Sequence, residues 1–373
     1  MDSTSHKAPG KILWIGGYSV LERPNISMVS AVNAYVSARV KTLDGKSAEI
    51  HSPQLGMHAS GFFDAEGRLS VECSKELLLL KAAVEVASRY AAANGAKISG
   101  ISVEARNDSA FSYSIASGKV VKSGLGSSAA VTAASIGAIL KFYGLSIEEN
   151  DALHKLAQIA HSIATGKIGS GFDIAAAVHG SILYTRYSPG IVKDLPGNYS
   201  NGQLAETVKK SWDYKIEKFG IPENFRLLAA NFIGESMSTS KSVGSVSGFK
   251  AENPTKYADA VKAINDENIK AVEALKKVKI GDISAMNEFR DAFDKGRLLT
   301  KELGVLSGVG IEPDDCTLLI EESKRHGAYV AKLPGAGGKD FIAALCSSDD
   351  NLSELRAFWQ ARSDLSILDI AFA

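Results

Sequence analysis

The stretch Lys122-Ser123-Gly124-Leu125-Gly126-Ser127-Ser128 is a loop of small residues that runs directly into a helix-like segment from Ala129 to Tyr143. Glycines let a ligand approach the backbone closely, and a helix N-terminus offers free N–H groups and the positive end of its dipole. The loop is not a Walker A sequence, and Ala129 stands where the dinucleotide fingerprint requires its third glycine. The stretch therefore predicts an anion site, and the alternative is an ordinary helix start with a serine as N-cap.

The segments around this loop predict a first domain rich in sheet. Apolar and β-branched runs predict strands at 12–15, 32–40, 48–51, 101–104 and 182–187. We expect the strand at 48–51 to pair with the strand at 32–40. Helical composition and spacing predict helices at 76–93, 129–143 and 153–164. Ser188-Pro189-Gly190 breaks the last strand, so we place the first domain at residues 1–190.

The second half, residues 191–373, has a different order of elements. A polar stretch at 193–220 precedes a strand at 227–231, and the Ser- and Gly-rich segment 234–248 is expected to be a loop. The remaining pattern predicts helices at 257–277, 283–303 and 314–326, a hairpin at 328–333 and 340–346, a helix at 352–362 and a strand at 365–371. This order suits a split βαβ, ferredoxin-like domain, so the fold class is α+β with two domains.

Composition excludes several classes of function. The 373 residues include 42 basic and 42 acidic side chains, which argues against nucleic acid or an anionic membrane as partner. No stretch stays apolar for the roughly 18 residues of a membrane span, and residues 1–10 lack the apolar core of a signal peptide. The three cysteines are widely spaced, which is typical of a reducing compartment, so we expect a cytoplasmic protein.

Three glycine-bearing segments follow one another in a fixed order. Ala8-Pro9-Gly10-Lys11-Ile12-Leu13 comes first, the loop at 124–128 second, and Leu333-Pro334-Gly335-Ala336-Gly337-Gly338-Lys339-Asp340 third. This order resembles the GHMP kinases, the family of galactokinase, homoserine kinase, mevalonate kinase and phosphomevalonate kinase. Within that family, the segments 10–24 and 166–181 look specifically like the phosphomevalonate kinases.

The resemblance implies a fold and an activity. It implies an N-terminal domain like ribosomal protein S5 domain 2, a C-terminal ferredoxin-like domain, and an active site in the cleft between them. The implied reaction is ATP-dependent phosphorylation of 5-phosphomevalonate to 5-diphosphomevalonate, with Mg²⁺ as cofactor. Such an enzyme would be a monomer or a homodimer.

The resemblance also implies roles for individual residues. Lys11 and Asp173 would face the transferred phosphoryl group as catalytic residues. The residues implied to hold the ATP phosphates are Lys122, Gly124, Leu125, Gly126, Ser127, Ser128 and Ala129, and Ser128 would lie near Mg²⁺. The residues implied to bind the phosphorylated acceptor are Lys11, Tyr18, Ser19, Lys167 and Ser170.

The chemistry of the acceptor gives a hypothesis for Asp173. A phosphomonoester is already largely dianionic at pH 7, so its attack on ATP needs no general base. We expect Asp173 to orient Lys11 and the metal, whereas the alternatives are a helix N-cap for Asp173 and a solvated strand-end lysine for Lys11. Further cations and hydroxyls should hold the acceptor, and the candidates beyond the matched motifs are Arg186 and the loop 236–242 with Lys241. His161 and His179 are expected to pack or cap.

Rival functions remain at this stage. The nearest is a mevalonate kinase, or a kinase for another phosphorylated mevalonate. A diphosphomevalonate decarboxylase shares the fold, but Lys11 argues against it by resemblance. A sensor built on an inactive kinase is a non-catalytic alternative, and the joint presence of Lys11, Ser128 and Asp173 argues against that.

Overall fold

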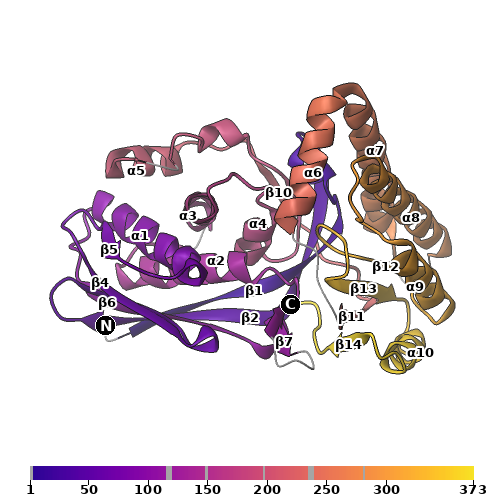
Figure 1. Cartoon of the computed structure of the whole chain (residues 1–373), viewed down its shortest axis with the longest axis horizontal. Coiled ribbons are helices and arrows are strands. Elements are labelled where there is room, and N and C mark those ends of the chain that lie inside the picture. Colours follow the sequence, from indigo (N-terminus) through magenta and orange to yellow (C-terminus); the bar gives the residue numbers. More distant parts are fainter. Residues whose placement is uncertain (1–2, 115–119, 148–149, 196–197, 234–238, 280–281) are drawn as a thin grey trace.

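The computed structural model describes residues 3–114, 120–147, 150–195, 198–233, 239–279 and 282–373. Two α+β domains lie next to each other along the long axis of the molecule (Figure 1). The first sheet contains eight described strands: β1 (Ser3–Ile15), β2 (Ile26–Leu43), β3 (Ser47–Ser52), β4 (Met57–Phe63), β5 (Leu69–Val71), β6 (Gly100–Asn107), β9 (Ile182–Thr185) and β10 (Lys215–Lys218). The small hairpin of β7 (Ser112–Ser114) and β8 (Val120–Lys122) stands apart from it.

The hairpin of β1 and β2 is the main structural element of this sheet. The two strands pair antiparallel from Ser3 opposite Lys41 to Ile15 opposite Met28. Buried and exposed side chains alternate in the second half of β2, as in a strand with one covered face, whereas its first half is buried almost throughout. The first half is covered more fully because α4 and α7 both pack against β2.

The strand order corrects one prediction. The sheet runs β10-β9-β2-β6-β3-β4-β5, with β1 joined to β2, so β6 separates β2 from β3. The expected pairing of the strand at 48–51 with the strand at 32–40 is therefore wrong. β3 instead pairs parallel with β6 and antiparallel with β4. Pairings between segments distant in the chain depend on tertiary packing, which local sequence patterns do not report.

The helices of the first domain gather on one side of the sheet (Figure 1). They are α1 (Leu78–Ala93), α2 (Ser127–Phe142), α3 (Asp151–Thr165), α4 (Phe172–His179) and α5 (Asn201–Lys209). α2 lies at the centre, against β1, β2, α1, α3 and α4. Its small, apolar residues are buried around most of its circumference, which matches a helix enclosed on all sides. This burial fixes the N-terminus of α2, and with it the glycine loop.

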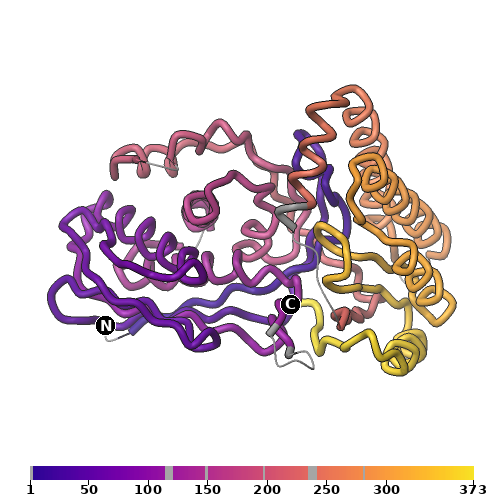
Figure 2. Tube along the Cα trace, in the orientation of Figure 1, coloured from indigo at the N-terminus to yellow at the C-terminus, as the bar shows by residue number. Residues whose placement is uncertain are grey.

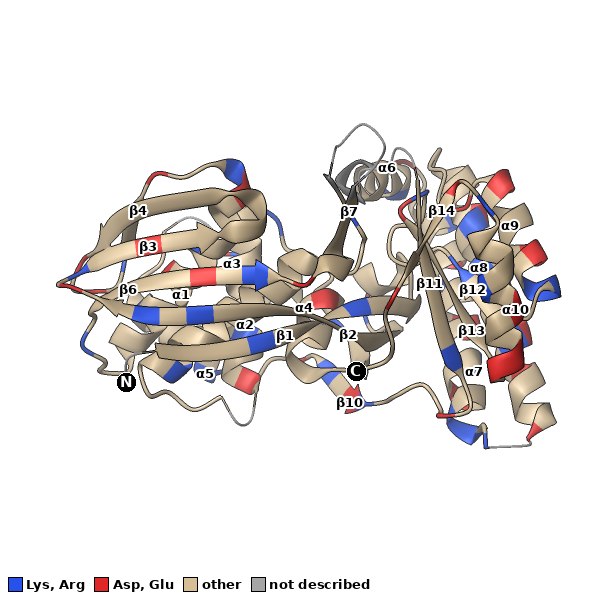
Figure 3. Cartoon of the chain, turned by 90° about the horizontal axis from the view of Figure 1, so that it is seen from below, with Lys and Arg blue, Asp and Glu red and all other residues tan. Residues whose placement is uncertain are grey.

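The second domain contains a four-stranded antiparallel sheet in the order β12-β13-β11-β14. Its elements are β11 (Arg226–Phe232), α6 (Thr239–Glu252), α7 (Pro254–Lys277), α8 (Ile283–Leu306), α9 (Asp314–Arg325), β12 (Val330–Lys332), β13 (Phe341–Cys346), α10 (Asp349–Gln360) and β14 (Leu365–Leu368). The sequence order strand, helices, strand, strand, helix, strand confirms the predicted ferredoxin-like arrangement. Both acidic and basic residues lie along α8, α9 and α10 at the outer end of this domain (Figure 3).

Two segments differ from the expectations. The predicted loop at 234–248 contains the start of α6, where Val243, Val246 and Phe249 pack at helical spacing against Tyr257 and its neighbours. Tertiary packing there outweighs the low helix propensity of serine and glycine. The polar stretch at 193–220 contains α5, which begins with a capping box formed by Ser200 and Gln203.

The chain stays with the first domain beyond residue 190. β10 pairs with β9, and α5 packs against α1 and α3. The chain therefore leaves the first sheet at Lys218, past the boundary that we placed at 190. The last residues return to the first domain, where Phe372 bridges to Val32 of β2 (Figure 2).

Candidate active site

The glycine loop ends in an uncapped helix N-terminus. α2 begins at Ser127, and Gly126 is its N-cap residue in the left-handed conformation, with φ 82° and no side-chain cap. The first hydrogen bond of the helix runs from the Ala130 N–H to the Gly126 carbonyl, at 3.2 Å. The alternative interpretation, a serine as N-cap, is therefore wrong, because both serines lie inside the helix. The preceding N–H groups, those of Ser127, Ser128 and Ala129, suit an anion.

Lys11 of β1 lies directly against this loop. Its backbone N–H donates to the Leu125 carbonyl at 2.9 Å, and its Nζ donates to the Gly124 carbonyl at 2.8 Å. The side chain is only 7% exposed, so the alternative of a solvated strand-end lysine is wrong. Burial lowers the pKa of Lys11, while the carboxylates of Asp173 and Asp340 act in the opposite direction. Two acidic groups thus favour a buried cation beside the loop.

Glycine is required where Lys11 crosses the loop. A Cβ at Gly126 would lie 2.9 Å from Cε and 3.2 Å from Cγ of Lys11. A Cβ at Gly124, whose φ is 63°, would lie 2.7 Å from the Phe341 ring. The absence of these two side chains lets the lysine and β13 close on the loop from two directions.

Asp173 reaches the site from the start of α4. Gly171 is the N-cap residue of α4, so Asp173 lies within the first turn, and the N-cap interpretation of this residue is wrong. Its Oδ1 accepts a hydrogen bond from the Ile174 N–H at 3.0 Å. Gln158 of α3 holds the turn in place by donating to the Gly171 carbonyl at 2.8 Å. The carboxylate is half-buried and acts on the charge of Lys11.

The third glycine segment lies against the segment 10–24, which contains Lys11. The Tyr18 hydroxyl donates to the Ala336 carbonyl at 2.9 Å, and a Cβ at Gly17 would lie 3.7 Å from the Gly335 carbonyl oxygen. Lys332 Nζ donates to the Trp14 carbonyl at 2.9 Å. All three glycine segments therefore meet at one place between the two domains.

The sequence did not predict a role for two residues in this region. Asp340 was given no individual role, although it lies two residues after the last glycine of the third segment and acts on Lys11. Lys332 interrupts an otherwise apolar strand, which was a usable signal for a buried cation. Burial lowers the pKa of Lys332 to about 8, and Glu312 opposes that shift.

The residues predicted to bind the acceptor occupy different environments. Ser19 is fully buried, and its hydroxyl accepts a hydrogen bond from Asn268 of α7 at 3.1 Å, which joins the two domains. The Ser170 carbonyl accepts a hydrogen bond from Tyr184 at 3.2 Å, and Lys167 is exposed. Lys122, predicted to contact ATP, is exposed at the end of β8. The ligand contacts of these residues stay predictions.

Arg186 is buried and bridges two loops of the site. It donates to the carbonyls of Leu21, at 2.8 Å, and Ile168, at 3.2 Å. These contacts hold the segment 10–24 and the segment 166–171 together. Arg186 therefore stabilises the positions of these two segments relative to each other.

The serine-rich loop at 236–242 lies only partly within the described residues. The residues 236–238 and the side chains of 239–241, including Lys241, lie outside the described part of the chain. Ser242 is buried in α6 and forms a hydrogen bond with Tyr18, whose pKa burial raises to about 12. Tyr18 thus contacts the end of the predicted acceptor loop.

His179 packs, as expected, whereas the described contact of His161 is made by its backbone carbonyl. His179 lies 3.1 Å from His154 in a ring-nitrogen contact within the first domain. The His161 carbonyl accepts a hydrogen bond from Thr165 within α3. Neither histidine contacts Lys11 among the described interactions.

The side-chain oxygens available here fit a magnesium ion that is bound together with phosphates. Among the described residues there is no group of three or more His, Cys, Asp or Glu side chains that would hold a metal alone. Mg²⁺ in kinases is commonly bound by one or two protein oxygens plus phosphate oxygens. Ser128 in the first turn of α2 and Asp173 in the first turn of α4 are oxygen donors of the right kind.

Comparison with known proteins identifies the family. The model for the GHMP kinases N terminal domain matches residues 78–181, and the model for the GHMP kinases C terminal region matches residues 271–364. These two matches contain α2 with its loop, Asp173, and the third glycine segment. The chain belongs to the GHMP kinase family.

Within this family, the chain is similar over most of its length to several phosphomevalonate kinases. The phosphomevalonate kinase of Saccharolobus solfataricus is 31% identical over 97% of this chain and 95% of its own. The peroxisomal phosphomevalonate kinase of Arabidopsis thaliana is 26% identical over 97% of this chain and 93% of its own. The structure of Streptococcus pneumoniae phosphomevalonate kinase in complex with phosphomevalonate and AMPPNP matches with a TM-score of 0.77 and 20% identity, covering 99% of each chain.

Proposed function

We propose that this protein transfers the γ-phosphoryl group of ATP to 5-phosphomevalonate, giving 5-diphosphomevalonate and ADP. The observation that carries the proposal is the meeting of Lys11, Asp173 and the uncapped start of α2 at one place. Likeness to phosphomevalonate kinases over almost the whole chain supports the choice of acceptor.

Charge neutralisation is the main task of such a site. Phosphoryl transfer depends on positioning and on stabilising the charge that spreads over the phosphoryl oxygens. In this chain the N–H groups of Ser127, Ser128 and Ala129 would hold ATP phosphate oxygens. Lys11, fixed by its bond to the Gly124 carbonyl, would contact the transferred group from the β1 side. The ammonium group is already in place before substrates bind, so little reorganisation is required.

Asp173 would act as a positioning group. The acceptor phosphate is largely dianionic at neutral pH, so it attacks without losing a proton. The carboxylate favours the charged form of Lys11, and it would also orient a metal ion. Ser128 and Asp173 would hold Mg²⁺, which supplies positive charge to the ATP phosphates when it is bound.

An acceptor panel tests the proposal. ADP release would be measured with mevalonate, 3-phosphomevalonate, 5-phosphomevalonate and diphosphomevalonate, and carbon dioxide release would be followed in parallel. We expect turnover with 5-phosphomevalonate and no carbon dioxide. Preference for mevalonate, or carbon dioxide release from diphosphomevalonate, would assign the protein to one of the rival activities.

The predictions of cellular location and oligomeric state also belong to this proposal. No described helix has the length and apolar character of a membrane span. A cytoplasmic location and a monomeric or homodimeric state stay predictions. Fractionation of cells and sedimentation of the purified protein are the measurements that check them.

A further inference from the structure

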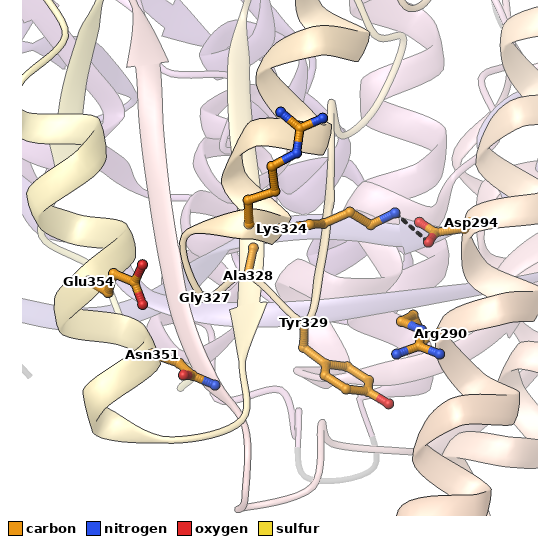
Figure 4. Close-up of a pocket in the computed structure, with 9 residues that line it drawn as sticks. Arg290, Asp294, Lys324, Gly327, Ala328, Tyr329, Asn351 and Glu354 are labelled. Atoms are coloured by element: carbon orange, nitrogen blue, oxygen red, sulfur yellow. Dashed lines mark hydrogen bonds and ion pairs between the residues drawn. The ribbon is translucent and has the colours of Figure 1, made fainter.

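Polar and charged side chains also gather away from the phosphate loop. In the C-terminal domain, acidic and basic side chains both line a cavity of about 510 Å³, and Lys324 pairs there with Asp294 at 2.5 Å (Figure 4). That cavity offers no single charge to a ligand. The first domain contains a different arrangement, a buried chain of polar side chains from α3 and α4 that ends at the turn before Asp173.

Gln158 of α3 lies at the centre of this chain. Its Nε2 donates to the Gly171 carbonyl at 2.8 Å and lies 2.9 Å from Nε2 of His154. On the far side of the imidazole, Nδ1 of His154 lies 3.1 Å from Nε2 of His179 in α4. His154 is fully buried and Gln158 is only 4% exposed, so water competes little for these contacts.

The chemistry of the amide determines the direction of each hydrogen bond in the chain. An amide nitrogen only donates, so Nε2 of His154 accepts from Gln158 and the imidazole proton is on Nδ1. Nδ1 of His154 then donates to Nε2 of His179. Burial lowers the pKa of both histidines, that of His179 to about 4, so both rings are neutral at pH 7, as this order requires.

His154 determines which way the Gln158 amide faces. If the amide were turned over, its oxygen would face two other acceptors, the Gly171 carbonyl and the lone pair on Nε2 of His154. Both hydrogen bonds would be lost among buried groups, and a buried polar group without a partner costs free energy. The imidazole therefore selects the amide orientation that binds the Gly171 carbonyl.

The turn at Gly171 is held by side chains on two consecutive carbonyls. Gln158 binds the Gly171 carbonyl, and the Tyr184 hydroxyl donates to the Ser170 carbonyl at 3.2 Å. A Cβ at Gly171 would lie 2.8 Å from Nε2 of Gln158 and from the Tyr184 oxygen, so the backbone lies directly against both groups. The Gly171 carbonyl also accepts a backbone hydrogen bond from the first turn of α4. Its position therefore fixes the start of α4, two residues before Asp173.

We propose that His154 and Gln158 are positioning residues for Asp173. Both side chains are buried and act through the backbone of Gly171, which holds the first turn of α4 where the Asp173 carboxylate favours the charge of Lys11. The inference rests on the proposed function, because that function gives Asp173 its place beside the transferred phosphoryl group.

The tautomer of His154 is the first test. In the full chain labelled with ¹⁵N-histidine at pH 7, two-dimensional NMR distinguishes a proton on Nδ1 from a proton on Nε2. His154→Gln and His179→Gln variants assign the two rings among the seven histidines. We expect a neutral ring with its proton on Nδ1, and a proton on Nε2 or a charged ring would overturn the proposal. No substrate is required, so this result separates a failure of the inference from a failure of the proposed function.

Kinetics of four variants of the full chain are the second test. Gln158→Met removes the amide at similar length, and His154→Leu removes the acceptor, whereas His154→Gln keeps an oxygen near the place of Nε2. Val84→Ala removes buried apolar surface from α1 and is the control for lost stability. The rates would be measured with the acceptor that the panel selects, so a different acceptor leaves the comparison intact. Circular dichroism would check folding, and Gln158→Met serves if His154→Leu is unfolded.

The loss should appear in kcat. We expect a fall of about 10- to 100-fold in Gln158→Met and His154→Leu, with a KM for ATP within about twofold of the wild type, because the start of α2 is unchanged. His154→Gln should recover most of the rate, and Val84→Ala should keep it. A wild-type kcat in Gln158→Met would overturn the proposal.

A double variant separates positioning from a general structural role. If Gln158 acts through Asp173, then Gln158→Met should cause little further loss of kcat in an Asp173→Asn background, because both changes remove the same contribution. Losses that multiply in Gln158→Met/Asp173→Asn would show that the two residues act independently, and would overturn the proposal.

Discussion

Replacing Gly126 with alanine should slow catalysis as well as destabilise the protein. Gly126 has a φ of 82°, where an L-residue costs about 1–2 kcal/mol. The new Cβ would lie 2.9 Å from Lys11 Cε, and the lysine is fixed by its 2.8 Å bond to the Gly124 carbonyl. The lysine must therefore shift, and a displacement of ~1 Å in such a site costs about 100-fold in rate.

Gly144→Ala is the matched control for this prediction. Gly144, just after α2, also has a positive φ, 74°, but a Cβ there meets nothing within 4 Å. Both variants should lose about 1–2 kcal/mol in urea unfolding. Only Gly126→Ala should lose about 100-fold in kcat, measured as ADP release with saturating ATP and 5-phosphomevalonate. A wild-type kcat for Gly126→Ala, or an equal loss in Gly144→Ala, would refute the reasoning.

Three further predictions follow from single contacts. Asp173→Asn should lower the rate by a factor that stays constant from about pH 6.5 to 8.5, because the acceptor needs no base; a loss that follows one titrating group in the pH profile of kcat contradicts this. Tyr18→Phe removes the bond to the Ala336 carbonyl and should lower the free energy of unfolding by about 1 kcal/mol, so an unchanged urea midpoint counts against it. Burial lowers the pKa of His179 to about 4, so the unfolded chain gains this proton near pH 6.5 and the folded chain only near pH 4. Its contribution to stability is complete above pH 6.5 and falls towards pH 4, and urea unfolding of His179→Gln should show a flatter dependence; an equal slope would contradict the assignment.

The sequence predicted the parts of the fold that local patterns control. The two strands that flank the third glycine segment, and the helix after the glycine loop, lie within a few residues of their expected bounds, whereas the strand expected at 12–15 begins as early as Ser3. The family resemblance implied an active site between the two domains, and the three glycine segments meet there. The short strands β4 and β5 were missed, because three to seven residues carry little periodicity.

The missed features depend on contacts between distant segments. β3 pairs with β6, a strand that is about fifty residues away in the chain. α6 is helical because Val246 packs into a cluster with Tyr18 and Tyr257, despite a sequence rich in serine and glycine. Asp340 acquires its effect on Lys11 only when the C-terminal domain closes on β1. Local propensity contains no information on such contacts.

The return of residues 371–373 to β2 has a mechanical consequence. The backbone passes between the domains once after β10 and again after β14, and the second passage ends in bonds from Asn33 N–H to Ala371 O, at 3.0 Å, and from Ala373 N–H to Ala31 O, at 3.1 Å. Ala31 is the residue that faces Lys11 across the β1–β2 hairpin. Two chain connections favour rotation of one domain about the line through both connections, and they oppose sliding of one domain past the other. Any such rotation would displace the strand that pairs with Lys11, so the last residues of the chain connect domain motion to the proposed phosphoryl-transfer site.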